Sequence, residues 1–98
     1  MIQTNYIDTI DELEICFKDE KVPIVKKLSN NVEFEFNSNN DLTKIVLPKF
    51  CQMMHRQYPP DTIFQYDHAI FDKNHVTMII QVNNQPIKVR VDLSELDK

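Results

Sequence analysis

The sequence predicts an α+β fold: a single small domain, residues 1–98, with one antiparallel sheet of six or seven short strands and one helix packed on it. Several segments alternate apolar and polar residues with period two, which is typical of half-buried strands. One segment instead repeats apolar residues at spacings of three and four, which is typical of an amphipathic helix. A chain of 98 residues is long enough for one hydrophobic core and too short for two.

The sequence predicts several strands before residue 48. Segments 13–17 (LEICF) and 32–36 (VEFEF) show the clearest alternation. Pro23 limits segment 24–28 to an edge strand or a strand start, because proline has no N–H to donate to a neighbouring strand. Two turns separate these strands. One is formed by paired asparagines at 30–31, and the other, SNND at 38–41, leads into a further strand at 42–47. We therefore expect a meander of short antiparallel strands.

The predicted helix begins at Pro48, which suits the first helical position, and continues to about residue 57. Tyr58, Pro59 and Pro60 end it, since a residue before proline avoids the helical region. Segment 62–66 can extend as a strand, and 67–74 is predicted to be a loop.

A strong hairpin is predicted at the end of the chain. Segment 75–82 alternates, and Ile79 makes it apolar on part of both faces, so we expect it to be a central strand. Asn83 and Asn84 form the turn into a final strand at 87–92, which is followed by a frayed tail or a single helical turn.

The chain contains no glycine, and this excludes several kinds of site. Walker loops and dinucleotide fingerprints need glycine for a tight turn and for close approach of the backbone to phosphate. The nucleophile elbow of serine hydrolases needs it as well. Asparagine is the best substitute in left-handed turns, and nine are present. Abundant Ile, Asn and Lys with a single Ala indicate an A/T-rich genome, such as that of a low-G+C bacterium or its phage.

The location predicted for the chain is the cytoplasm. Its N-terminal residues lack the basic and apolar regions of a secretory signal, and no apolar run approaches the roughly 20 residues that span a bilayer. Cys16 and Cys51 are expected to be free thiols, because two cysteines make no disulfide framework.

The first half of the chain contains a spaced pattern of residues followed by a hairpin. Tyr6, Asp11, Leu13 and Ile15 fit the pattern Tyr-x4-Asp-x-Leu-x-Ile, and the hairpin lies around 32–47. This layout resembles a family of short bacterial domains of unknown function. The resemblance implies a small β-rich fold of bacterial or phage origin, and it implies no reaction. Such domains are similar in size to proteins encoded beside toxin genes.

The charge distribution suggests a surface for a protein partner. The net charge is −4, and residues 1–41 contribute nine acids against four bases. If the strands at 13–17 and 32–36 are neighbours, their glutamates share one sheet face. Such a patch favours docking on a basic partner over nucleic-acid binding. The predicted partner-binding residues are Glu12, Glu14, Glu33, Glu35, Asp11, Asp19 and Glu20.

The leading hypothesis is therefore a non-enzymatic cytoplasmic protein-binding module without cofactor, either a monomer or a homodimer, that acts as an inhibitor or antitoxin-like partner. The first alternative is nucleic-acid binding through Lys73, Lys88 and Arg90, together with an aromatic loop after residue 57. The second is a metal-dependent enzyme at Cys51 and His55, which would share one face of the predicted helix. An ordinary solvated acidic face is the competing structural explanation.

Overall fold

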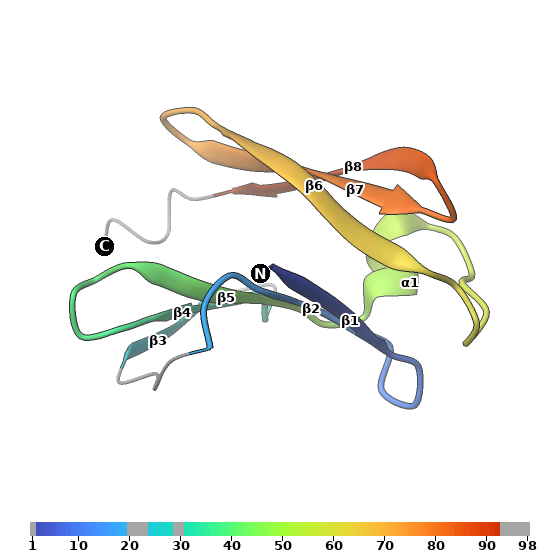
Figure 1. The fold of residues 1–98 in the computed structure, drawn as a ribbon, viewed down its shortest axis with the longest axis horizontal. Coiled ribbons are helices and arrows are strands. Elements are labelled where there is room, and N and C mark those ends of the chain that lie inside the picture. Colours follow the sequence, from blue (N-terminus) through green and yellow to red (C-terminus); the bar gives the residue numbers. More distant parts are fainter. Residues whose placement is uncertain (1, 20–23, 29–30, 93–98) are drawn as a thin grey trace. The chain divides into compact units, whose positions relative to one another are not determined.

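The structure, a computed structural model, describes residues 2–19, 24–28 and 31–92, and it is mostly β (Figure 1). Eight strands form two antiparallel sheets, of five and three strands, with one short helix among the described residues. The chain divides into two compact units, residues 1–60 and 61–98. The predicted α+β fold is confirmed in its antiparallel pairing and its helix, whereas the prediction of one sheet with six or seven strands is wrong.

The first unit contains the five-stranded sheet, in the order β1-β2-β5-β4-β3. Its strands are β1 (Gln3–Ile7), β2 (Glu12–Cys16), β3 (Ile24–Lys27), β4 (Glu33–Phe36) and β5 (Leu42–Leu47). The predicted meander holds only for β3, β4 and β5, because β2 pairs with β5 rather than with β3. Strand β1 was not predicted, since its sequence QTNYI has too few apolar residues to show alternation.

Strand register separates this sheet into an apolar face and a polar face. Leu13 of β2 pairs with Leu47 of β5, and Ile45 of β5 lies between Ile15 and Phe34 on the two neighbouring strands. All five of these side chains are at most 2% exposed. Since side chains alternate across a strand, the residues between them point to the opposite face.

Helix α1 (Phe50–Met54) is shorter than predicted. Lys49 before it and His55 after it both adopt the left-handed conformation, and neither can continue an α-helix there. Lys49 provides no side-chain cap. Instead, a residue far away in the sequence accepts a hydrogen bond from the helix start: the N–H of Phe50 donates to the carbonyl oxygen of Asp11 at 2.9 Å.

The second unit contains a three-stranded sheet of β6 (Phe64–Phe71), β7 (His75–Val82) and β8 (Gln85–Asp92) (Figure 1). Strand β7 lies between the other two, which confirms its predicted central position and the final hairpin. The predicted loop at 67–74 is wrong, because β6 continues to Phe71 after a register shift between Tyr66 and His68. The tail at 93–98 lies outside the described residues.

Asparagine performs the turns that glycine would otherwise make. Of the seven described residues with positive φ, four are asparagines: Asn31, Asn40, Asn83 and Asn84. The side chain of Asn37 also holds the β4–β5 turn, because its Oδ1 accepts hydrogen bonds from the N–H groups of Asn39 and Asp41, both at 2.9 Å. The absence of glycine is thus compensated by local asparagine chemistry.

The β7–β8 turn gives a direct test of this role. Asn83 and Asn84 both have positive φ (49° and 70°), as a type I′ turn requires. We expect Asn84→Ala to lower the free energy of unfolding by about 1 kcal/mol, because alanine is strained in the left-handed region. Asn84→Gly should match or exceed the wild type. Urea unfolding of the three proteins measures both effects, and equal stability of the alanine and glycine variants would contradict the turn assignment.

Candidate functional site

Four predicted glutamates lie on the polar face of the five-stranded sheet, which we call the acidic face: Glu12, Glu14, Glu33 and Glu35. The prediction that β2 and β4 are neighbours is wrong, because β5 lies between them. The register of the three strands nevertheless places their glutamates on the same face. Val46 of β5 pairs with Glu14 on one side and Glu33 on the other, and Lys44 of β5 pairs with Glu35.

Two lysines lie among these glutamates. Lys44 forms an ion pair with Glu14, and Lys27 lies 3.9 Å from Glu33. The side chains of Glu14 and Lys44 are 18% and 31% exposed, so this ion pair is only partly screened by water. Lys27 is 57% exposed, so its longer contact with Glu33 is screened more strongly.

The negative charge of the acidic face exceeds what its lysines balance. Burial raises the pKa of Glu12, and the neighbouring carboxylates of Glu14 and Glu33 raise it further, while Lys44 lowers it. Burial is the largest of these effects, and among the charges Glu14 and Glu33 each act more strongly on Glu12 than Lys44 does.

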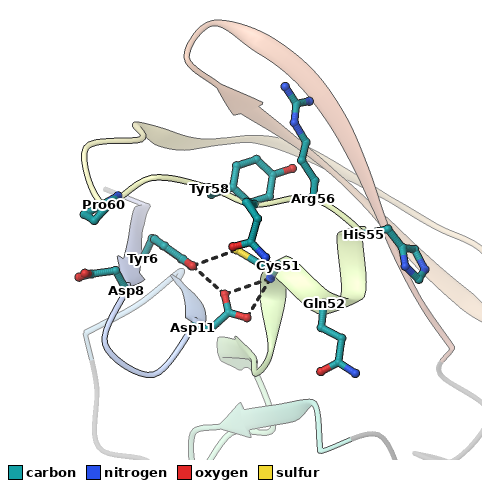
Figure 2. Close-up of a pocket in the computed structure, with 10 residues that line it drawn as sticks. Tyr6, Asp8, Asp11, Cys51, Gln52, His55, Arg56, Tyr58 and Pro60 are labelled. Carbon is teal, nitrogen blue, oxygen red and sulfur yellow. Dashed lines mark hydrogen bonds between the residues drawn. The ribbon is translucent and has the colours of Figure 1, made fainter.

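The other predicted partner-binding residues lie elsewhere or are undescribed. Asp19 is exposed after the end of β2, and Glu20 lies outside the described residues. Asp11 belongs to the β1–β2 turn and not to the acidic face, because its carboxylate is directed to helix α1 (Figure 2).

Asp11 links the β1–β2 turn to α1 through its carboxylate. Its Oδ1 accepts a 2.6 Å hydrogen bond from the hydroxyl of Tyr6, and both carboxylate oxygens accept from the N–H of Cys51, at 3.0 and 3.1 Å. The Tyr6 hydroxyl also lies 3.2 Å from Sγ of Cys51. Asp11 therefore caps the helix start from 40 positions away in sequence, which no local pattern could reveal.

The electrostatics of this cluster favour an ionised Asp11. Burial alone would raise the pKa of Asp11, but hydrogen bonds from Tyr6 and from the N–H groups of Cys51 and Gln52 outweigh it and lower that pKa. Burial raises the pKa of Tyr6, and its hydrogen bonds and charge interactions with Asp11 and Cys51 raise it further. The tyrosine thus remains a neutral donor to a charged acceptor.

A pocket of about 630 Å³ surrounds this cluster. It lies within the first unit, between β1, the turn after it, helix α1 and the segment after the helix (Figure 2). Its walls include Tyr6, Asp8, Asp11, Cys51, Gln52, His55, Arg56, Gln57, Tyr58 and Pro60. Its volume is in the range that holds small ligands or a single inserted side chain. Sequence patterns did not indicate it, because its walls come from segments far apart in the chain.

The structure does not bring Cys51 and His55 to one helix face. Cys51 is buried and directed to Tyr6, whereas the ring of His55, beyond the end of the helix, points away from it (Figure 2). His68 contacts Asp67, and His75 lies near Asp72, each in the second unit. Within the described part of the chain, no group of three or more His, Cys, Asp or Glu residues is placed to hold a metal ion. Both cysteines are free.

The basic residues of the nucleic-acid alternative lie in the second unit. Lys88 and Arg90 alternate with buried residues on β8, and both are exposed. Nη2 of Arg90 lies 3.3 Å from Nδ1 of His75. Lys73 is exposed between β6 and β7. Because β8 is an edge strand among those described, its charges also protect that edge from pairing.

Comparisons with protein-family models, with curated proteins and with solved structures find no match to this chain. The family resemblance of the first half therefore stays a prediction. Among the described residues, no helix has the length and apolar character needed to cross a membrane.

Replacement of Asp11 by asparagine tests the helix cap. The asparagine side chain would keep the shape and tolerate the left-handed backbone at φ 52°, but it would lose the charge. At neutral pH we expect Asp11→Asn to lower the free energy of unfolding by about 2 kcal/mol, since hydrogen bonds to a charged group are lost. Because folding lowers the pKa of Asp11, its stabilisation is present above the unfolded pKa and is lost as pH falls through the folded pKa.

Urea unfolding between pH 7 and pH 2 measures this dependence. Below about pH 4 the stabilities of wild type and Asp11→Asn should converge. Asp61→Asn, which removes an exposed carboxylate from the second unit, serves as the control and should stay parallel to the wild type. A constant difference between wild type and Asp11→Asn over the whole pH range would contradict the proposed role of the charge.

Proposed function

We propose that this protein is a small protein-binding module rather than an enzyme, and that its acidic face docks on a basic partner. An inhibitor or an antitoxin-like partner of a nucleic-acid-handling protein fits this function, because such proteins carry the cationic surface that the acidic face complements.

One observation carries the proposal: the register across β2, β5 and β4 gathers four glutamates on one face of one sheet. In this arrangement Glu14, Val46 and Glu33 form one row, and Lys44 and Glu35 belong to the next. Like charges that share a face destabilise a sheet. Lys27 and Lys44 offset this cost only in part, and a partner would supply the remaining positive charge.

The electrostatic cost is visible at Glu12. Burial and the two neighbouring carboxylates raise its pKa, although Lys44 is close enough to act against them. A surface serving only for solubility gains nothing from this concentration, since the same charges spread apart would solvate the sheet equally well. A cationic partner would relieve the repulsion on binding and thereby contribute to affinity.

Replacing Glu33 and Glu35 by glutamine tests the proposal. The change removes two negative charges and, unlike replacement by lysine, adds no positive charge that would repel Lys44. We expect the tagged protein to capture a basic protein from lysate of a low-G+C bacterium at low salt and to release it at high salt, because screening weakens charge pairing. The double variant Glu33→Gln, Glu35→Gln should bind the purified partner about tenfold more weakly. Calorimetry measures both affinities, and circular dichroism checks the fold.

The matched control removes the same two charges elsewhere. Asp61 and Asp72 are exposed in the second unit, and Asp61→Asn with Asp72→Asn should retain affinity within about twofold. Equal weakening of the two double variants would mean that net charge, and not the acidic face, determines binding. Recovery of nucleic acid in place of protein would favour the alternative that uses Lys73, Lys88 and Arg90.

A further inference from the structure

The pocket of the first unit has an acidic side without a counter-cation. Asp8 and Asp11 both line it, and Figure 2 shows Asp8 and Pro60 on the side of Tyr6 that faces away from Cys51. Within the described residues, no Lys, Arg or His nitrogen lies within ion-pair distance of either carboxylate.

The donors that the described residues offer to the Asp11 carboxylate are all neutral. These are the Tyr6 hydroxyl and backbone N–H groups at the start of α1. Neutral donors orient a carboxylate but do not cancel its charge, so a negative potential remains in the pocket beside the exposed carboxylate of Asp8. A partly buried charge of this kind favours a cation in the adjoining space.

The cations of the pocket wall itself do not fill this space. The guanidinium of Arg56 lies over the ring of Tyr58, 5.8 Å from its centroid, and extends away from Asp11 (Figure 2). His55 also points away from the two carboxylates (Figure 2). Both residues therefore belong to the opposite rim.

The lining favours an organic cation over a metal ion. Both oxygens of Asp11 already accept N–H donors, which leaves little coordinating capacity for a metal. The Tyr6 ring and Pro60 offer apolar surface beside Asp8, and an alkyl stem packs on such surface while its charged end reaches a carboxylate.

We propose that this pocket binds an alkylammonium or guanidinium group, supplied by a lysine or arginine side chain of the basic protein partner. This inference rests on the proposed function, because it assigns a second contact to the same partner. The Asp8 carboxylate pairs with the cation, Asp11 contributes its charge from the interior, and the apolar wall holds the stem.

Titration with small probes tests the pocket without the partner. In nuclear magnetic resonance spectra, N-acetyl-arginine amide and N-acetyl-lysine amide should shift the backbone amide signals of Tyr6, Asp8, Asp11 and Cys51. The neutral N-acetyl-norleucine amide should leave them unshifted. Asp8→Asn should weaken binding of the cationic probes about three- to tenfold, as expected for loss of one charge pair. Asp19→Asn removes an exposed acid outside the pocket lining and should have no effect.

The contrary results are equally specific. Absence of shifts, equal shifts from the neutral probe, or unchanged binding to Asp8→Asn would each overturn the pocket assignment. Binding of the free diamine putrescine more tightly than either side-chain probe would overturn the assignment to a protein side chain. None of these results depends on Glu33 or Glu35, so failure of the pocket inference is distinguishable from failure of the acidic-face proposal.

Discussion

The pairing of β5 with β2 on one side and β4 on the other determines both faces of the five-stranded sheet. On one face this pairing brings Leu13, Ile15 and Phe34 against Ile45 and Leu47 of β5, and all five side chains are at most 2% exposed. Because alternate residues point in opposite directions, the same register places the glutamates of β2 and β4 together on the other face. A slip of one residue would bury carboxylates and expose the core, so hydrophobic burial fixes the position of the acidic residues. The acidic face is therefore as well defined as the core.

A second, longer-range constraint comes from Asp11. Its carboxylate and its carbonyl oxygen both accept from the first N–H groups of α1, which lets a five-residue helix form without a local cap. The same carboxylate orients the Tyr6 hydroxyl and so shapes the pocket. Tyr6 pairs with Leu13 and therefore lies on the apolar side of the sheet, whereas Glu12 and Glu14 of β2 lie on the other. Because β1 is an edge strand among those described in this sheet, a partner docked on the acidic face would reach the pocket around that edge. The pocket and the acidic face both carry excess negative charge, which is the basis for our proposal that both bind positively charged groups.

Local sequence patterns predicted the strands whose one face is buried, and they did not predict features that depend on distant residues. Alternation located β2, β4, β7 and β8, the SNND turn located the start of β5, and paired asparagines located the final turn. Strand β1 was missed because its sequence QTNYI does not alternate apolar and polar residues. Strand β6 was predicted to end too early, because a bulge at Asp67 interrupts its alternation and the residues beyond it, Ile70 and Phe71, are 58% and 61% exposed. The four glutamates were predicted correctly as one face, although through the wrong strand neighbours. Asp11 was assigned to partner binding as an acid at the margin of the acidic face. Its role as a helix cap was missed, because the helix that it caps lies about 40 residues further along the chain.

The central claim is that the glutamates gathered on one face lie close enough for Glu14 and Glu33 to raise the pKa of Glu12. The pKa of Glu12 in the free protein, measured by nuclear magnetic resonance titration of its side-chain carboxyl carbon, tests this claim most directly. We expect a pKa above the ordinary value for glutamate, since burial and the carboxylates of Glu14 and Glu33 raise it, and we expect Glu33→Gln to bring it down. An ordinary pKa that does not respond to Glu33→Gln would show that the glutamates act independently, and it would contradict the acidic face as a binding surface.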